Sequence, residues 1–448
     1  MRRTLKELPE SLDETYERIL KEIKKPNRGL AQRVLQCLVV AIRPLRVSEL
    51  AEVLAVDLDN LEGIPRLNTN WRWEDQEQAL LIACSSLITI VEAGDGDSDV
   101  ETSDNDSGVE TGDSRVVQFS HFSVKEFLTS SRLSSANGEV STYWIDLENA
   151  HTILAQACLG VLLQTHDEID GSTSKDHPLA RYAAKHWTTH AQFGEVSSRL
   201  QKGMEYLFNL DRPHFRVWLM LYDIDTDPED GDNTTFHQFT PYYKSAATPL
   251  YYAALCGFRD LVEHLIAKYP QDLNANGGYY MRPLIAALAG EHFQTADLLR
   301  HKGADPHVQG FEKTIPLHSA AIYEKLEVAQ KLIEYGADID ARDVNGRTPL
   351  YWASSGHHFK DDSVVQLLLE RGADVNARAK NDSTPLHRAS KHGALEVVRL
   401  LLGHGADVEA VSVDGETSLQ AVGKTSIGKV DQRQCDRITR LLLEYGAK

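Results

Sequence analysis

The chain has 448 residues, of which 42% are hydrophobic and 25% charged, proportions of an ordinary globular protein with roughly two to four domains. Its 47 basic and 66 acidic residues give a formal net charge of −19. A surface of this charge repels phosphate backbones and anionic lipid, so the composition argues against nucleic acid and membranes as partners.

Compartment follows from cysteine usage and from the absence of targeting patterns. The five cysteines are scattered and include no Cys-x-x-Cys pair, which is typical of a reduced, intracellular protein. The N-terminus lacks the apolar stretch of a signal peptide, and no apolar run approaches the length of a membrane span. We expect a soluble protein of the cytoplasm, with the nucleus as an alternative.

Residues 1–135 mix helical and strand patterns. Apolar side chains at helical spacing predict four helices, at 11–20, 29–42, 48–56 (with Ser48 as cap) and 74–83. Stretches rich in Val, Ile and Thr predict two strands of a hairpin, at 86–92 and 116–120. Ser123 and Glu126 then have the spacing of a capping box at the start of another helix. Three helices and a two-stranded hairpin outline a winged-helix module over 29–135.

Between the two strands lies an acidic insertion, residues 94–114, with eight acidic residues and no basic one. A segment this polar cannot bury a core, so we expect a disordered wing loop. It is a tolerated surface insertion or, alternatively, a site of phosphorylation or docking. Residues 1–150 carry 16 Lys and Arg against 27 Asp and Glu, which disfavours DNA binding by the wing.

Residues 136–243 read as a helical connector without catalytic chemistry. His186 and His190 could share a helix face at a spacing that zinc sites use. No His-Glu-x-x-His pattern or third ligand accompanies them, so we interpret both as structural. No Gly-x-Ser-x-Gly nucleophile motif and no phosphate-binding P-loop occur in the chain; the nearest approach, Gly423-Lys424-Thr425, lacks the first glycine. We therefore expect no enzyme activity, no metal and no cofactor.

From residue 244 the chain is periodic. Thr-Pro-Leu or a degenerate copy begins at 248, 282, 315, 348, 384 and 417, and Gly-Ala-Asp recurs at Gly303, Gly336, Gly372 and Gly405. Threonine accepts hydrogen bonds from free amides of a first helical turn, and proline at its first position wastes no donor. Glycine supplies the left-handed conformation that ends a second helix. About six two-helix repeats are predicted, stacked as a solenoid.

These signatures resemble the ankyrin repeat family, most closely over 384–407. The resemblance implies an α-solenoid of helix-turn-helix units with β-hairpin tips, so that the fold class is mainly α. Three copies depart from the pattern. The first has Tyr269-Pro270-Gln271 in place of Gly-Ala-Asp, as a capping repeat might; the fourth gains residues near 358–361, and the sixth gains residues between 424 and 436.

The front half resembles the region that follows the nucleotide-binding NACHT domain in fungal receptor-like proteins. Residues 8–20 look like the join between the two domains, which leaves 1–28 as a helical remnant. The segments 43–50 and 119–128 look like the winged-helix core, and 179–190 with 214–222 look like the helical connector. In the family the winged helix packs on a nucleotide motor, which is absent from this sequence.

Partner contacts in the ankyrin family use hairpin tips and the outward side of the first helices. The resemblance carries the helix positions onto Tyr252, Leu255, Cys256, Ser319, Ile322, Tyr323, Trp352, Ser355, Arg388, Lys391 and His392. It carries the tip positions onto Tyr279, Tyr280, Phe311, Asn345, Lys380, Asn381 and Asp414. Tyrosine, tryptophan and arginine are frequent energetic anchors, although Tyr252 and Trp352 could equally pack within the array. An aromatic face that becomes basic in the fifth repeat suits a partly acidic protein partner.

The sequence thus predicts a non-enzymatic protein-interaction scaffold, the regulatory and recognition part of a NACHT-type receptor. One alternative is a winged-helix regulator that binds DNA. Another is a fragment of a longer signalling ATPase whose P-loop is encoded upstream.

Overall fold

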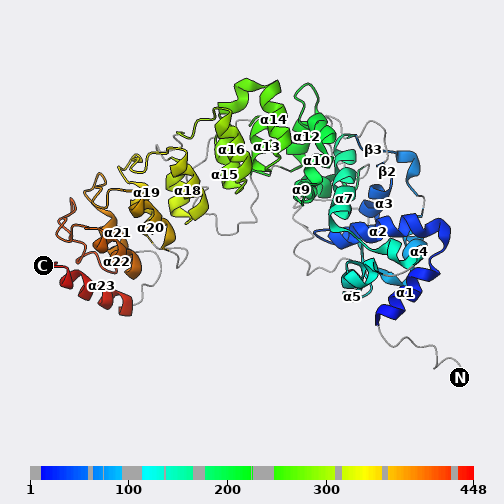
Figure 1. The fold of residues 1–448 in the computed structure, drawn as a ribbon, viewed down its shortest axis with the longest axis horizontal. Coiled ribbons are helices and arrows are strands. Elements are labelled where there is room, and N and C mark those ends of the chain that lie inside the picture. The colour runs from blue at the N-terminus through cyan, green and yellow to red at the C-terminus, as the bar shows by residue number, and fades with distance from the viewer. Residues whose placement is uncertain are drawn as a thin grey trace, which may run out of the picture. The chain divides into compact units, whose positions relative to one another are not determined.

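The structure is a computed structural model that describes residues 12–58, 64–73, 75–92, 114–135, 138–164, 177–222, 224–225, 247–307, 315–355, 362–424 and 432–448. The chain divides into two compact units, residues 1–227 and 228–448 (Figure 1). The predicted acidic loop lies outside the described residues except for Ser114, and so do the extra residues of the fourth and sixth copies and Phe311.

The first part of the N-terminal unit consists of short helices around a small sheet. Its helical elements are α1 (Leu12–Glu22), η2 (Lys25–Asn27), α2 (Arg28–Val40), α3 (Val47–Leu54), η3 (Thr69–Trp71), α4 (Gln76–Cys84), η4 (Ser85–Leu87), α5 (Ser123–Leu128), α6 (Ser131–Ser134) and η5 (Glu139–Tyr143). The four helices expected in residues 11–83 are thereby confirmed to within about two residues at either end.

The sheet has three strands in the order β1-β5-β4. These are β1 (Leu45–Arg46), β4 (Ile88–Glu92) and β5 (Arg115–Phe119), and all neighbours are antiparallel. Val117 of the central strand faces Leu45 on one side and Ile90 on the other. The sequence predicted only the hairpin of the two longer strands, because a two-residue strand has no alternation to recognise. A separate pair joins β2 (Val56–Asp57) and β3 (Arg66–Leu67).

Both helix caps expected in this part are wrong. Helix α3 begins at Val47 instead of Ser48, and the amide of Arg46 donates to the Glu49 carboxylate at 2.8 Å. At α5 the Ser123 hydroxyl lies 2.7 Å from the Tyr16 hydroxyl and 2.6 Å from His121 Nδ1 instead of capping free amides. The Ser123 side chain contacts Tyr16, which is distant in sequence, and so does not cap the helix.

The helices that follow share a core with the front part. They are α7 (Leu147–Leu162), α9 (Ala180–Ala191), α10 (Val196–Arg199), α11 (Gln201–Leu207) and α12 (His214–Leu221). Helix α7 packs against both α2 and α9, and Trp187 and Trp218 meet edge to face with ring centroids 5.4 Å apart and are fully buried. The predicted boundary between residues 135 and 136 therefore falls inside one compact unit.

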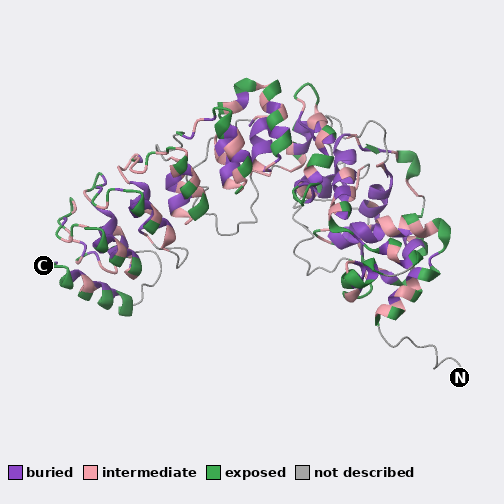
Figure 2. Ribbon diagram, in the orientation of Figure 1, coloured by how far each residue is buried: buried purple, intermediate pink, exposed green. Residues whose placement is uncertain are grey.

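The second unit is built from successive pairs of short antiparallel helices (Figure 1). The pairs are α13 (Pro249–Leu255) with α14 (Arg259–Lys268), α15 (Pro283–Ala289) with α16 (Phe293–His301), α17 (Pro316–Ile322) with α18 (Leu326–Glu334), α19 (Pro349–Ala353) with α20 (Ser363–Glu370), and α21 (Pro385–His392) with α22 (Leu395–Gly403). The 3-10 helix η7 (Pro270–Asn274) follows α14. Figure 2 shows the buried residues gathered where these helices face one another. We number the repeats one to six by their starts at 248, 282, 315, 348, 384 and 417.

The local chemistry of the repeats is as expected. The hydroxyls of Thr248, Thr348 and Thr384 accept from the amide three residues on, and each is followed by a proline at the first helical position. Gly372 has φ of +89°, the left-handed conformation predicted after a second helix. The aspartate of each Gly-Ala-Asp then accepts from the amide two residues later, as Asp374 does from Asn376 at 3.0 Å.

Two expectations for the repeats are wrong. The tips are tight turns and not β-hairpins in the described residues, where the one β-bridge of the array joins Val411 and Thr417. In the described tips a bond runs from an amide to the carbonyl four residues on, as from Asp343 to Arg347 at 3.0 Å. In the sixth repeat residues 418–423 form turns where a first helix was expected, and the one helix described is α23 (Gln432–Glu444).

Candidate functional site

Neighbouring repeats are joined by a side chain at one motif position, the residue after Thr-Pro-Leu. His318 Nε2 donates to the Arg347 carbonyl at 3.1 Å, and His387 Nε2 donates to the Glu416 carbonyl at 3.0 Å. The Tyr251 hydroxyl accepts from the amide of Tyr280 at 3.0 Å in the same way. Each of these bonds spans 29 residues. They hold successive tips at a constant offset, so the tip side chains lie along one side of the array.

The joining histidines are structural groups. Burial lowers the pKa of His318 and of His387, because desolvation disfavours the charged imidazolium, and the backbone carbonyls only partly offset this. The ring of His387 also contacts its own threonine, with Thr384 Oγ1 2.9 Å from Nδ1. Rings whose two nitrogens are both engaged in this way hold the tips in position.

At the start of the array, part of the predicted binding face is buried. Tyr252 is 3% exposed and Cys256 is 3% exposed, so neither can contact a partner and the prediction is wrong for both. The aromatic ring of Tyr252 packs edge to face against Tyr251 at 5.3 Å. Leu255 is half-buried. The rule that first-helix residues face outward fails here because aromatic side chains fill the space between neighbouring first helices.

The second and third repeats bring three predicted tyrosines together. Tyr279 and Tyr280 meet edge to face at 5.0 Å and are half-buried. Burial, with a smaller effect from Tyr280, raises the pKa of Tyr323 to about 12, so the two hydroxyls lie near one another. Ile322 and Ser319 are half-buried on the same first helix, α17. This part of the face is aromatic, as expected.

The fourth and fifth repeats contain a cluster of aromatic and basic side chains, which we name the Trp352 cluster: Asp343, Arg347, Tyr351, Trp352 and Arg388. The guanidinium groups of Arg347 and Arg388 lie 4.9 and 5.4 Å from the Trp352 ring centroid. Arg388 lies 5.6 Å from the Tyr351 ring as well. Trp352 and both arginines remain half-exposed, so this cluster combines three accessible side chains of the types that anchor interfaces.

Asp343 holds the Trp352 cluster together through hydrogen bonds. This residue is 5% exposed. Oδ1 accepts from the amides of Asn345 and Arg347 at 2.8 Å each, and Oδ2 accepts from Trp352 Nε1 at 3.1 Å. One buried side chain therefore closes the tip of repeat four and fixes the direction of the indole.

A hollow of about 370 Å³ lies between the tips of repeats four and five. We name it the tip pocket; it is lined by Arg342, Asp343, Val344, Gly346, Arg378, Ala379 and Lys380. The two tips are tied together by a bond from the Lys380 amide to the Asn345 carbonyl at 2.8 Å. Arg342, Arg378 and Lys380 are exposed. Asp343 belongs to both the tip pocket and the Trp352 cluster, so the two are continuous.

The remaining predicted residues flank these features. Asn345 is half-buried in the tip of repeat four, while Lys380, Asn381, Lys391 and Asp414 are exposed and His392 and Ser355 are half-buried. The structure therefore brings Trp352, Arg388, Lys380 and Asn345 into one region. The sequence analysis missed Asp343, Arg347, Arg342 and Arg378. Asp343 could have been found, because Asp-x-Asn-Gly is a turn in which the first side chain caps its own backbone.

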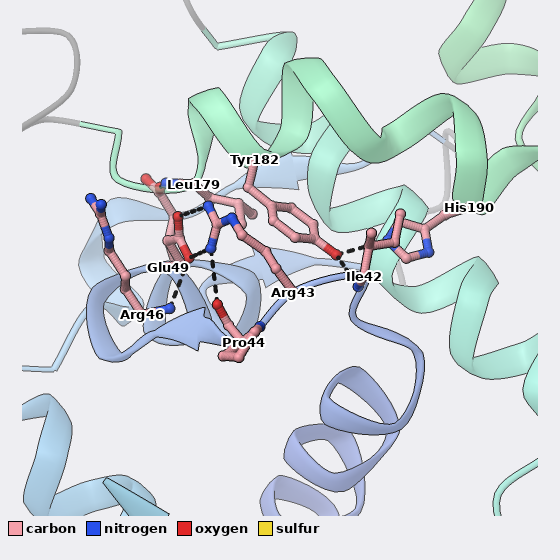
Figure 3. Close-up of polar contacts among 9 residues, drawn as sticks. Ile42, Arg43, Pro44, Arg46, Glu49, Leu179, Tyr182 and His190 are labelled. Carbon is pink, nitrogen blue, oxygen red and sulfur yellow. Dashed lines mark hydrogen bonds and ion pairs between the residues drawn. The ribbon is translucent and has the colours of Figure 1, made fainter. Parts of the chain in front are cut away.

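The N-terminal unit holds a buried polar network of a different kind (Figure 3). Arg43 makes two bonds to the Glu49 carboxylate, at 2.6 and 2.8 Å, and lies 5.0 Å from the Tyr182 ring. The Tyr182 hydroxyl lies 2.9 Å from His190 Nε2 and accepts from the Ile42 amide at 3.3 Å. These bonds connect the loop before β1 to helix α9.

His190 continues the network and explains why its spacing from His186 is not a metal site. Its Nδ1 lies 2.9 Å from His151 Nδ1, so both of its ring nitrogens are engaged. Burial lowers the pKa of His190 to about 3, and the neighbouring His151 and His186 rings act in the same direction. The ring is therefore neutral, and the network stabilises the packing of α9.

Family comparisons agree with the periodicity. The family of ankyrin repeats matches three overlapping stretches, 284–379, 317–412 and 358–448, and a single ankyrin repeat matches 247–275. None of the described helices is long and apolar enough to cross a bilayer.

Three curated relatives illustrate how far the similarity extends. The chain is 30% identical over 311 residues to the Azaphilone pigments biosynthesis cluster protein L of Monascus ruber, which covers 67% of this chain and 61% of that protein. It is 30% identical over 100 residues to NF-kappa-B inhibitor alpha of Gallus gallus (22% and 31%) and 36% identical over 78 residues to the ARF GTPase-activating protein Git of Drosophila melanogaster (17% and 11%). The matches thus span less than two thirds of each relative.

The period, the caps, the joining side chains and the family matches over 247–275 and 284–448 all agree, and the C-terminal part of the chain, residues 247–448, is an array of ankyrin repeats.

Proposed function

We propose that the chain is a non-enzymatic scaffold that binds a protein partner along the tips and first helices of its repeats. Ankyrin repeats imply protein–protein interaction, because a stacked array offers a long surface with no enclosed chemistry. The observation that carries the proposal is the Trp352 cluster. The Trp352 indole is half-exposed and has two guanidiniums over its ring. Tryptophan and arginine are the residue types that most often anchor protein interfaces.

The test compares partners captured from cell extract by the full chain and by a Trp352→Ala/Arg388→Ala variant. We expect the double variant to lose partners that the wild type retains, since both side chains would be anchors. The control is Arg300→Ala/Arg371→Ala, which removes exposed cations from the second-helix side. Unchanged capture by the Trp352/Arg388 variant, with its melting curve intact, would contradict the proposed surface.

We further propose that the chain is the regulatory and recognition part of a NACHT-type receptor, with a winged-helix module before the repeats. Three observations support this reading. The sheet order β1-β5-β4, with α2 before the first strand and α3 and α4 between β1 and β4, is compatible with the order of elements in a winged helix. The long strands flank the acidic segment where a wing would lie. The match to the azaphilone cluster protein exceeds the length of 247–448, so it includes residues before the repeats.

Transcript mapping tests the receptor proposal. Messages that join an upstream exon encoding a P-loop to this chain would support the alternative of a longer signalling ATPase. A binding assay between this chain and separately expressed NACHT proteins from the same cell tests the reading of a chain that acts without its own motor. If no such transcript is found and no NACHT protein binds, the receptor proposal is contradicted and the scaffold proposal stands by itself.

We also propose an intracellular site of action, in the cytoplasm or the nucleus. All five cysteines are buried thiols, and burial raises the pKa of Cys37 and of Cys84 to about 12. Buried thiols of this kind are small core residues. Cysteines that are not joined in disulfides are typical of a reducing compartment. Imaging of a fluorescent fusion in live cells checks the location.

A further inference from the structure

We infer that the tip pocket and the Trp352 cluster together bind an acidic peptide segment of the partner. The inference rests on the proposed function and deepens it, because it names the chemistry of the partner and the residues that select it. Five cations converge there: Arg342, Arg378 and Lys380 at the tip pocket, and Arg347 and Arg388 at the Trp352 cluster.

None of these cations makes an ion pair in the described part of the chain, although Asp340 lies near enough to Arg342 to feel its charge. Several basic side chains elsewhere in the array do make ion pairs, as Lys325 does with Glu291 at 2.7 Å and Arg282 with Asp305 at 2.9 Å. The one carboxylate inside the site, Asp343, is occupied by two amides and the indole. In a chain of net charge −19, these five grouped cations form a local basic patch.

The guanidinium of Arg342 is held in place before any ligand binds. Its Nη1 donates to the carbonyls of Gly346 at 3.1 Å and Arg378 at 2.6 Å, which belong to or adjoin the two tips that form the pocket. Its other guanidinium nitrogens have no bonding partner in the described residues and remain for a carboxylate. Pre-organisation lowers the entropy cost of binding, and arginine matches a carboxylate in bidentate geometry.

Arg388 gives a second and independent reason. Its Nε is buried and has no hydrogen-bond partner among the described residues. A buried donor without an acceptor costs free energy, and burial also lowers the pKa of this guanidinium. A carboxylate that binds the half-exposed part of the guanidinium would supply the opposite charge, while the Trp352 ring keeps the side chain in position.

The geometry favours a peptide over a nucleic acid. Single-stranded nucleic acids bind by stacking bases on open aromatic faces along a continuous basic groove. Here two guanidiniums already lie over the Trp352 ring, and neighbouring repeats carry exposed acidic residues such as Asp374 and Asp414. Carboxylates spaced along an extended peptide can reach separate arginines without bringing a continuous line of phosphates near the acidic remainder of the chain.

The experiment measures binding of a fluorescein-labelled peptide of alternating Glu and Gly to the full chain by anisotropy, with an alternating Gln and Gly peptide as the uncharged control. We expect the Glu peptide to bind, the Gln peptide not to bind, and the affinity to fall as salt is raised. An Arg342→Gln/Arg378→Gln/Lys380→Gln variant should bind at least about tenfold more weakly, as loss of a central anchor does.

The matched control, Arg259→Gln/Arg300→Gln/Arg371→Gln, removes three exposed cations outside the site and should change the affinity by less than about twofold. Because Arg342 also supports the tips, Lys380→Glu serves as a second variant. The Lys380 side chain is exposed and makes no hydrogen bond or ion pair in the described residues, so this variant should weaken binding without disturbing the fold. Equal loss in both triple variants, or binding of single-stranded DNA as tight as that of the Glu peptide, would overturn the inference.

The scaffold proposal and this inference can fail separately. If the Trp352→Ala/Arg388→Ala variant loses captured partners while no acidic peptide binds, the surface is correct and the acidic class is wrong. If the Glu peptide binds as expected but capture is unchanged, the site binds carboxylates and the partner surface lies elsewhere on the array.

Discussion

Trp352 Nε1 donates a hydrogen bond to Asp343 Oδ2 at 3.1 Å, and the other oxygen of the same carboxylate accepts from two amides of the tip. A single buried carboxylate thus couples the conformation of the repeat-four tip to the direction of the Trp352 indole. The turn at the tip and the proposed binding surface therefore depend on the same hydrogen bonds.

Replacing Asp343 by alanine should lower the free energy of unfolding by about 1–3 kcal/mol, because three donors lose their acceptor in a buried setting. Urea unfolding followed by circular dichroism measures the change. Asp414→Ala is the control: it is an exposed aspartate of a neighbouring tip, and it should stay within about 0.5 kcal/mol of the wild type. Equal effects would mean that the Asp343 bonds contribute nothing beyond those of a surface residue.

Truncation of Leu386 to alanine should destabilise the array by about 2–5 kcal/mol, the cost of a cavity in a packed core. Leu386 is 0% exposed, whereas Leu326, at the start of α18, is 36% exposed. The same substitution at Leu326 should therefore cost much less. Thermal melts of the two variants give the comparison, and an unmoved melt for Leu386→Ala would show that the inner face is misplaced.

Two glycines with similar backbone angles should respond differently to alanine. Gly278 and Gly372 have φ of +72° and +89°, so both variants carry backbone strain of about 1 kcal/mol. A Cβ on Gly278 would also lie 2.3 Å from the Tyr251 ring, whereas a Cβ on Gly372 meets nothing within 4 Å. Gly278→Ala should be the more destabilising of the two in urea unfolding. It should also free the Tyr280 amide from its bond to Tyr251, which amide exchange detects; the reverse order would contradict the packing described.

The buried ion pair of Arg43 and Glu49 gives an asymmetric prediction. Glu49 is 2% exposed, so Arg43→Gln leaves a buried carboxylate with only the Arg46 amide as a bonded partner and should cost about 3–5 kcal/mol. Arg43→Met/Glu49→Met removes both charges and should cost less than the single variant. Urea unfolding of the two proteins decides the point, and a double variant that is the less stable would show that the pair itself, and not the stranded charge, dominates.

His190 predicts a loss of stability in acid. Its folded pKa of about 3 lies below the unfolded value of 6.5, so the unfolded state binds more protons as the pH falls below 6.5. The free energy of unfolding should then drop by up to about 1.4 kcal/mol per pH unit until the folded pKa is reached. The groups that face the ring, Tyr182, His151 and His186, do not offer a compensating negative charge.

A His190→Gln variant isolates this contribution, since carboxylates titrate in the same range in both proteins. Urea unfolding at pH 7 and pH 5 should show a smaller acid loss in the variant than in the wild type. His404→Gln, at an exposed position after α22, should leave the acid loss unchanged. A wild-type slope that persists in His190→Gln would contradict the assignment.

Most of the repeat architecture was predictable because its determinants are local. Thr384 caps amides within three residues, Pro385 fits a first helical turn, and Gly372 ends a helix through its own φ. Such effects need no knowledge of the rest of the fold, and repetition of the same short pattern reinforced them. The front helices were found for a similar reason, from apolar spacing within single segments.

The errors and omissions share the opposite property. The strand at Leu45, the hydroxyl partner of Ser123 and the burial of Tyr252 all depend on segments distant in sequence. The binding surface is the same kind of feature: Trp352 and Arg388 were singled out by residue type, but their convergence with Arg347 over one ring, and the pocket that Arg342 and Arg378 share across two tips, arise from stacking neighbouring repeats. Caps and turns are decided by bonds within a few residues, whereas exposure and charge neutralisation are decided by whichever side chains the folded chain brings alongside.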